Sequence, residues 1–188
     1  MRAAGGAAAL ALAVALAGCG VETEEHARRV NPPSGVAHAW ATPTPPDSGT
    51  GAVPERLYLV RDGELVATTR HVAAEPTADE LVDDLLAGPT PGERADGLTS
   101  ALRATDVAGV QVSGGRATVE LTEVLDSGGR TDQVLAFAQI VCTLTARPGV
   151  TSVAFTHDGR EVGVPRADGS LSHAPATAAD YATLIGTR

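Results

Sequence analysis

The sequence predicts an α+β fold, in which antiparallel hairpins and two helices follow one another in the order ββαββαββ before a short C-terminal segment. Two observations lead to this prediction. Three pairs of short apolar segments are each joined by a two-residue turn, at Asp62-Gly63, Gly114-Gly115 and Asp158-Gly159. Between these pairs lie two segments with helical periodicity and helix-capping residues at their ends. We expect both helices to pack on one face of the sheet.

The three predicted hairpins have residue types that favour strands on both sides of each turn. "LYLV" (Leu57–Val60) and "ELVATT" (Glu64–Thr69) form the first, the segments around Val110 to Leu121 the second, and Ser152–Val164 the third. Asp-Gly and Gly-Gly supply the positive φ angles that two-residue turns require. Because aromatic residues make up only 3% of the chain, the core must be built from Val, Leu, Ile and Ala.

The first helix is predicted to begin after Thr77 and to end at Gly88-Pro89. Thr77 and Glu80 have the spacing of a capping box, in which the hydroxyl and the carboxylate bind free main-chain amides. The expected buried face consists of Leu81, Val82, Leu85 and Leu86. The acidic residues of this helix resemble a carboxylate site, but we expect a solvated face; they are Asp79, Asp83 and Asp84.

The second helix is predicted to run from Asp132 to Arg147, after Thr131 and before Pro148-Gly149. A narrow polar stripe is expected opposite its buried face. The stripe consists of Asp132, Ala136, Gln139, Thr143 and Arg147, and the buried face of Val134, Phe137, Ala138, Val141 and Leu144. Cys142 lies on the flank of the buried face, and we interpret it as a small core residue rather than a nucleophile.

Residues 1–18 are predicted to be a lipoprotein signal peptide. Arg2 precedes an apolar run that is too short for a membrane span of about 20 residues. The run ends in "LAGC" (Leu16–Cys19), which resembles the lipobox of bacterial lipoproteins, whose cysteine sulfur is acylated before the chain is cut in front of it. An ordinary secretory signal with a chance cysteine is the alternative. Lipidation of Cys19 would anchor the chain to the membrane and leave Cys142 without a disulfide partner.

Residues 19–54 are predicted to be the lipidated cysteine and a disordered, proline-rich tether, and residues 55–188 the folded domain. Residues 20–54 contain six of the twelve prolines and show no helical or alternating pattern. As a flexible coil, this segment has a reach of about 30 Å. His26, His38 and Trp40 lie in it, where nothing fixes the geometry of a metal site.

The composition excludes several functional classes. With 14 basic and 23 acidic residues, the net charge of -9 argues against binding to nucleic acid, whose phosphates need clustered basic residues. All 14 basic residues are arginine. P-loops, Schiff-base enzymes and Ser-Lys dyads require a lysine, so these classes are excluded.

We expect a protein that is not an enzyme and that uses no cofactor and no metal, because no group of residues forms a recognisable catalytic pattern. Ser170, Ser172 and His173 lie together in a polar segment that lacks the surroundings of a nucleophile. His71 and His157 could face each other in the sheet, but no third zinc ligand accompanies them.

A further candidate is the acidic group Glu120, Glu123 and Asp126, which are closely spaced in the sequence. Glu120 is expected to point outward if Val119 and Leu121 point into the core. A glycosidase needs two carboxylates on opposite sides of a cleft, and spacing along one strand does not establish that arrangement.

Three stretches of the chain resemble the GerMN domain of sporulation and spore-germination proteins. They are "LLAGPTPGERADGLTSAL" (Leu85–Leu102), "GGRATVELTEVL" (Gly114–Leu125) and "AQIVCTLTARPGVTSVAFTHDG" (Ala138–Gly159), and "DYATL" (Asp180–Leu184) matches more loosely. The resemblance covers the chain from Leu57 to the C-terminus. This chain has Ala178 where the family usually has Arg, and Cys142 where the family often has Tyr, as expected for a packing position.

The resemblance implies an exported, non-enzymatic module of the bacterial cell envelope. We expect a lipid-anchored protein on the extracytoplasmic face of the cell membrane that binds or scaffolds another protein, with open strand edges that pair with a partner strand. Direct binding of cell-wall peptidoglycan is the alternative. Carbohydrate sites usually use exposed aromatic side chains, and the domain has only Tyr58, Phe137, Phe155 and Tyr181.

Overall fold

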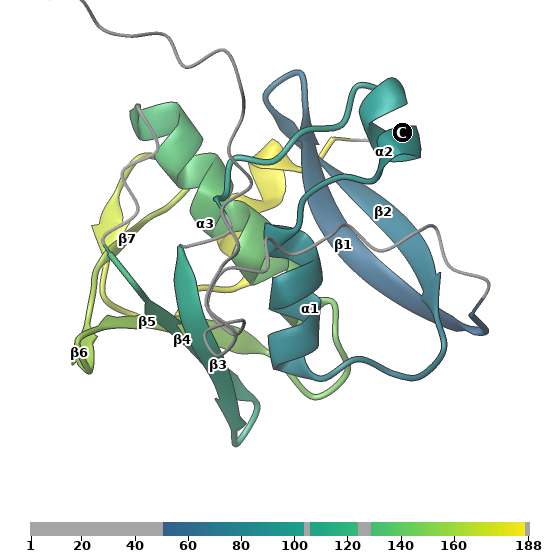
Figure 1. Ribbon diagram of the computed structural model, residues 1–188. Coiled ribbons are helices and arrows are strands. Elements are labelled where there is room, and N and C mark those ends of the chain that lie inside the picture. Colours follow the sequence, from purple (N-terminus) through teal and green to yellow (C-terminus); the bar gives the residue numbers. More distant parts are fainter. Residues whose placement is uncertain (1–50, 104–105, 124–128, 187–188) are drawn as a thin grey trace, which may run out of the picture. The chain divides into compact units, whose positions relative to one another are not determined.

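The computed structural model describes residues 51–103, 106–123 and 129–186 (Figure 1). The predicted signal peptide, Cys19 and nearly all of the predicted tether lie outside the described residues, as do His26, His38, Trp40 and Asp126. Within the described part of the chain, no helix is long and apolar enough to span a membrane.

The first hairpin pairs β1 (Val53–Arg61) with β2 (Glu64–Val72) in an antiparallel register that places Arg61 opposite Glu64. Asp62 and Gly63 form the turn with φ angles of 54° and 80°, which confirms the predicted two-residue turn. β1 begins at Val53, slightly before the predicted start of the domain at residue 55.

The first predicted helix is confirmed as α1 (Ala78–Leu86). Thr77 Oγ1 accepts a hydrogen bond from the Glu80 main-chain N–H, and the Glu80 carboxylate accepts one from the Thr77 N–H. The four predicted core residues of the helix are buried. A second, short helix that was not predicted, α2 (Pro91–Ala95), follows directly and repeats the capping box with Thr90 and Glu93.

The second sheet contains β3 (Val107–Ser113), β4 (Arg116–Leu121), β5 (Ser152–His157) and β6 (Arg160–Glu161), in that order. β3 and β4 form the second predicted hairpin, and β5 and β6 form the third, which is short. β4 and β5 run parallel, because α3 (Arg130–Thr145) carries the chain from the end of one strand back to the start of the next.

The C-terminal segment adds elements that the sequence pattern did not predict. Val164, expected in the third hairpin, belongs instead to β7 (Val164–Pro165), which pairs with β8 (Leu171–Ser172). A 3-10 helix, η1 (Ala178–Leu184), follows. Its buried Tyr181 donates a hydrogen bond from the hydroxyl to the main-chain oxygen of Pro165 at 2.8 Å, which fastens the segment to β7.

α3 is surrounded by other elements (Figure 1): it contacts β1 and β2, β5 and β7, and α1 and η1. The strands therefore form separate sheets around this helix rather than one sheet that carries both helices on one face. The fold class is the predicted α+β, and the predicted order ββαββαββ is compatible with the observed succession of elements.

The polar stripe predicted for α3 is wrong. Every residue from Val134 to Leu144 is buried, and Ala136, Gln139 and Thr143 have exposed fractions of 0%. Periodicity identified the polar residues correctly, but Gln139 and Thr143 bind the main chain of β1 rather than water, and only the ends of the stripe reach solvent. The helix also begins after Gly129, not after Thr131, and ends at Thr145.

Cys142 has an exposed fraction of 2%, which confirms that it is packed in the core. Burial raises the pKa of its thiol to about 12. Because the thiolate is the reactive form, the side chain is chemically quiet. The same core contains Phe137 and Phe155, whose rings meet edge to face with centroids 4.9 Å apart.

We expect Cys142 to resist a thiol reagent such as DTNB at pH 8 in the native chain and to react fully in guanidinium chloride, because unfolding restores its ordinary pKa and its access to solvent. The Cys19→Ser variant leaves Cys142 as the only thiol, so that reagent consumption reports on this residue alone. Rapid stoichiometric labelling of that variant without denaturant would contradict the burial.

Candidate functional site: the open end of strand β1

β2 covers only one edge of β1, and the other edge takes its partners from α3 and from a loop. The Tyr58 N–H donates to Thr143 Oγ1 at 3.0 Å, and Gln139 Nε2 donates to the Tyr58 carbonyl oxygen at 2.9 Å. Val60, two residues further along the same edge, exchanges two main-chain hydrogen bonds with Thr99 at 2.9 and 2.7 Å. Side chains of a helix thus replace a missing strand at Tyr58.

Every second residue of β1 directs its main-chain N–H and C=O away from β2. Arg56, two residues before Tyr58, therefore does so as well. Within the described part of the chain, neither group has a hydrogen-bond partner. α3 ends at Thr145 and supplies no side chain to this peptide group. Among the described residues, the edge of β1 is therefore open at Arg56.

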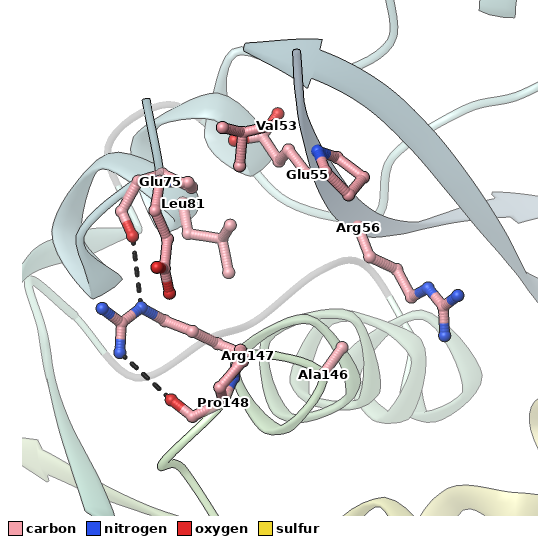
Figure 2. A pocket seen from close by; sticks show the side chains of 10 residues that line it. Val53, Glu55, Arg56, Glu75, Leu81, Ala146, Arg147 and Pro148 are labelled. Atoms are coloured by element: carbon pink, nitrogen blue, oxygen red, sulfur yellow. Dashed lines mark hydrogen bonds between the residues drawn. The ribbon is translucent and has the colours of Figure 1, made fainter. Parts of the chain in front are cut away.

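A groove of about 250 Å³ adjoins this open end (Figure 2). Its lining comes from the start of β1, the segment before α1, α1 itself and the end of α3, and is mostly apolar; it includes Pro54, Pro76, Leu81, Ala146 and Pro148. Arg147 joins two of these segments, since its Nε donates to the Pro76 oxygen at 3.2 Å and its Nη1 to the Pro148 oxygen at 3.3 Å. The groove is therefore an apolar recess whose walls are fixed by Arg147, and it lies beside the open edge at Arg56.

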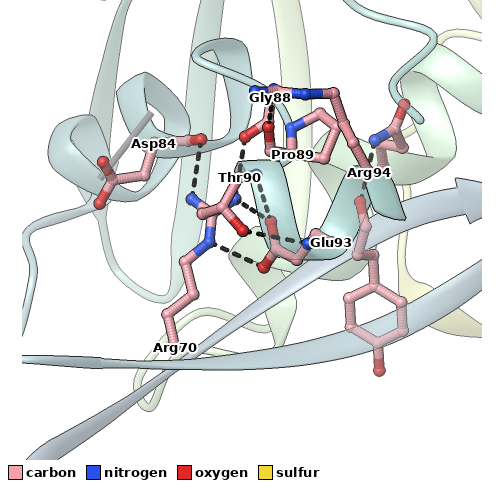
Figure 3. A network of polar contacts seen from close by, with 9 residues as sticks. Arg70, Asp84, Gly88, Pro89, Thr90, Glu93 and Arg94 are labelled. Atoms are coloured by element: carbon pink, nitrogen blue, oxygen red, sulfur yellow. Dashed lines mark hydrogen bonds and ion pairs between the residues drawn. The ribbon is translucent and has the colours of Figure 1, made fainter. Parts of the chain in front are cut away.

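A buried ion pair joins β2 to α2 (Figure 3). Arg70 is 3% exposed, and its Nε and Nη2 donate to the two carboxylate oxygens of Glu93 at 3.0 and 2.7 Å. It also donates to the main-chain oxygens of Asp84 at 3.4 Å and Gly88 at 2.9 Å. Burial alone would raise the pKa of Glu93, but hydrogen bonds from Arg70 and Thr90 hold it below its ordinary value. All three guanidinium nitrogens of Arg70 are therefore engaged.

Glu55 lines the groove from β1, directly opposite Arg70 in the strand register. It is 1% exposed, and among the described residues neither of its carboxylate oxygens has a hydrogen-bond partner. Its pKa is raised to about 7, first by burial and then by the neighbouring Asp84 carboxyl, which lies close enough to accept a hydrogen bond from protonated Glu55 and whose negative charge repels the ionised form. The charge of Glu93 acts in the same direction, and the charge of Arg70 acts in the opposite direction. Buried polar groups nearly always have partners, so Glu55 needs an explanation.

The sequence contains a signal for Glu55 that the predicted strand does not include. Glu55 alternates with Leu57 and Leu59 on the inward-facing side of β1, and a carboxylate at such a position indicates a buried charge. The predicted strand began at Leu57, which left Glu55 outside the pattern. Its connection to Arg70 on the other strand of the hairpin became visible only from the register.

The serine candidates near the C-terminus take part in local structural hydrogen bonds. Ser170 donates from its N–H and its hydroxyl to Asp168 Oδ1, which closes a turn. Ser172 Oγ accepts a hydrogen bond from Arg166 Nη2 at 3.1 Å. His173 is exposed, and the hydrogen bonds of Ser170 and Ser172 go to Asp168 and Arg166 rather than to it.

The remaining candidates are dispersed. His71 and His157 lie in different sheets, in β2 and β5, so the expectation that they face each other is wrong. Glu120 points away from the core as predicted and binds the Thr156 hydroxyl and the Gly159 N–H, and both bonds lower its pKa. Glu123 is exposed. Among the described residues, no group of three or more His, Cys, Asp or Glu side chains could hold a metal ion.

The solvated acidic face predicted for α1 is only partly correct. Asp79 Oδ1 accepts a hydrogen bond from the Val110 N–H at 2.7 Å and so holds β3 against the helix. Asp84 is half-buried and lies beside Glu55. Asp83 is exposed, and its pKa is raised by partial burial and by the other carboxylates of the helix.

Comparison with known proteins identifies one family. The family model Germane, described as sporulation and spore germination, matches residues 42–163. The tandem GerMN domains of the sporulation protein GerM from Bacillus subtilis are 20% identical with a TM-score of 0.54, over 67% of this chain and 46% of that chain. The first GerMN domain of the same protein is 22% identical with a TM-score of 0.50, over 59% of this chain and 86% of that chain. These likenesses concern the fold, and this chain spans about half of the tandem structure. No curated protein matches.

The Gln139→Leu variant is expected to lose about 1–3 kcal/mol of stability, because it leaves the Tyr58 carbonyl and the Ala101 N–H without their partner in a buried setting. Urea denaturation at constant pH measures this loss. The same substitution at the exposed Gln111 is the control and should change stability by less than about 0.5 kcal/mol. Equal effects at both positions would contradict the role of Gln139.

Glu55 is expected to make the protein less stable as the pH rises from about 4.5 to 7. Its pKa is higher in the folded chain than in the unfolded chain, so folding favours the protonated form; the stabilisation is fully present below the unfolded value and is lost as the carboxyl ionises. The loss is on the order of 3 kcal/mol. Urea denaturation between pH 4.5 and 8 should show this slope, and Glu55→Gln should flatten it. Glu75→Gln, at an exposed position of the same groove, should leave the slope in place.

Proposed function

Because the chain belongs to the Germane family of sporulation and spore-germination domains, we propose that it is a non-enzymatic binding module, anchored to the membrane on the extracytoplasmic face of the cell envelope. Its partner is another protein, which adds a strand to the open end of β1. The observation that carries this proposal is the unpaired main chain of Arg56 beside the apolar groove.

Strand addition fits the chemistry of this edge. A partner strand laid along β1 beyond Tyr58 would bond the N–H and C=O of Arg56, the peptide group that α3 does not reach. Its side chains would then point alternately toward the groove and away from it. Main-chain hydrogen bonds supply affinity in this mode of recognition, and the groove supplies specificity.

The predicted lipid anchor keeps the module at the membrane. Acyl chains on Cys19 bind the bilayer with about 0.8 kcal/mol for each buried CH₂, and two or three chains give stable attachment. The tether allows the domain to reach about 30 Å from the membrane surface. The partner is therefore expected in the same compartment, either in the membrane or close to it.

Direct binding of cell-wall glycan has less support. Among the aromatic residues of the described domain, Phe137 and Phe155 are 2% exposed and Tyr181 is 0% exposed, and Tyr58 is half-buried. The rings of Phe137, Phe155 and Tyr181 therefore offer no free face on which a sugar could stack, and Tyr58 alone makes a small aromatic surface. The open strand edge has no equivalent role in sugar recognition, so it favours a protein partner.

Photo-crosslinking in living cells tests the proposal, with the photoreactive amino acid at Ala146, which is exposed and lines the groove. We expect a crosslinked protein in the membrane fraction that is lost in the Arg56→Pro variant, because proline removes the outward N–H. The Arg56→Thr variant is the matched control: it removes the same side chain, keeps the N–H, and should retain the crosslink.

Three results would count against the proposal. Absence of a reproducible crosslink at Ala146 would contradict protein binding at the groove. A crosslink that persists in Arg56→Pro would contradict strand addition. Strong co-sedimentation with purified sacculi, without a crosslink, would replace the proposal with the glycan alternative. For the anchor, Cys19→Ser is expected to move the protein from the membrane fraction to the soluble fraction.

A further inference from the structure

We propose that the strand received by β1 carries a basic side chain, whose aliphatic stem lies in the groove and whose cationic group pairs with the carboxylate of Glu55. This inference rests on the proposed strand addition and adds the chemistry by which the partner is selected. It starts from the one buried carboxylate in the described part of the chain whose oxygens have no hydrogen-bond partner.

Among the described residues, the arginines around Glu55 are engaged elsewhere or point away from it. Arg70 lies directly across the hairpin, but its Nε and Nη2 are bound to Glu93 and its remaining bonds go to main-chain oxygens. Arg147, which also lines the groove, donates to the Pro76 and Pro148 oxygens. In Figure 2, the side chain of Arg56 extends away from Glu55. None of the three arginines is thus free to pair with Glu55, which leaves room for a cation supplied by a partner.

The charge around Glu55 favours an incoming cation over any other group. The Asp84 carboxyl of α1 lies beside it, and Glu93 of α2 adds to the negative potential, against the single positive charge of Arg70 on β2. Glu75 lines the same groove and is exposed. An anion would be repelled here, an apolar side chain would leave the Glu55 oxygens without partners, and a neutral donor would not balance the surrounding negative charge.

The remaining lining of the groove fits the stem of a basic side chain. The groove has an apolar lining that includes Pro54, Pro76, Leu81 and Pro148. Glu55 is the deeply buried polar residue of this lining. Lysine combines an apolar four-carbon stem with a charged tip, so it can bury its stem against apolar residues while its ammonium meets a carboxylate. A small metal ion is a poorer occupant, because no metal-binding group of three side chains occurs among the described residues.

The test uses two capped tripeptides, Ac-Val-Lys-Val-NH₂ and Ac-Val-Nle-Val-NH₂, in which norleucine keeps the stem of lysine and removes its charge. Binding to the full chain is measured by calorimetry at pH 8. We expect the lysine peptide to bind at least about tenfold more tightly than the norleucine peptide, and Glu55→Gln to abolish this difference. Glu75→Gln, on the same groove, should preserve it, which separates Glu55 from the general negative charge.

The pH dependence gives a second, independent readout. Lysine stays charged over this range, so the affinity follows the ionisation of Glu55 and should fall about tenfold from pH 8 to pH 6, given a pKa of about 7. An exposed carboxylate with an ordinary pKa would produce no change over the same range. The charged groups that face Glu55 are Arg70 on β2, Asp84 on α1 and Glu93 on α2.

Each outcome distinguishes the inference from the function on which it rests. Equal binding of the two peptides, lost in Arg56→Pro, would overturn the role of Glu55 and leave strand addition in place. A lysine preference that survives Glu55→Gln would also overturn it. Failure of both peptides to bind overturns the inference, and the crosslink at Ala146 then decides separately whether a protein partner occupies the groove. Glu55→Gln should fold, because it removes a buried charge; cooperative urea unfolding verifies this.

Discussion

The structure depends on how α3 binds the main chain of β1. A two-stranded hairpin is marginally stable by itself and must be covered by another element. α3 provides the cover, but a helix has no free main-chain groups along its length, so the outward peptide group of Tyr58 can be satisfied only by side chains. Gln139 and Thr143 supply them. This requirement fixes the rotation of the helix about its axis, because both side chains must face the strand.

The same constraint determines where the proposed binding site lies. Pro148 and Gly149 follow the end of α3, while β1 continues past that end toward Val53. Among the described residues, the outward main-chain groups of β1 therefore have hydrogen-bond partners opposite the helix and lack them beyond its end. The residues that follow the end of the helix also line the groove. α1 binds the main chain of β3 in a similar way, since its Asp79 carboxylate accepts a hydrogen bond from the Val110 N–H. In both cases a helix side chain occupies one position of a strand edge.

Local rules predicted the hairpin turns and the capping box of α1, but not the partners that polar residues find in distant parts of the chain. Asp62-Gly63 and the Thr77 capping box act within four residues, so the sequence states them directly. Gln139 was expected to face water, because periodicity records which residues are polar and not what they bind. Glu55 was missed for a similar reason: its significance depends on Arg70, fifteen positions along the chain, and on Asp84 in another element. The partners were invisible until the fold brought them together.

The charges around Arg70 explain why a domain would keep a carboxylate that weakens it. One guanidinium can form only one close bidentate pair, and Glu93 takes it. An apolar residue in place of Glu55 would fill the same space without the cost of burying an ionisable group, so folding alone gives no reason for a glutamate there. A cation brought by a partner would reverse this balance, since it favours the ionised form and draws the proton from Glu55. The residue that lowers the stability of the free domain would then raise the affinity of the complex, which is the usual relation between a binding site and the fold that carries it.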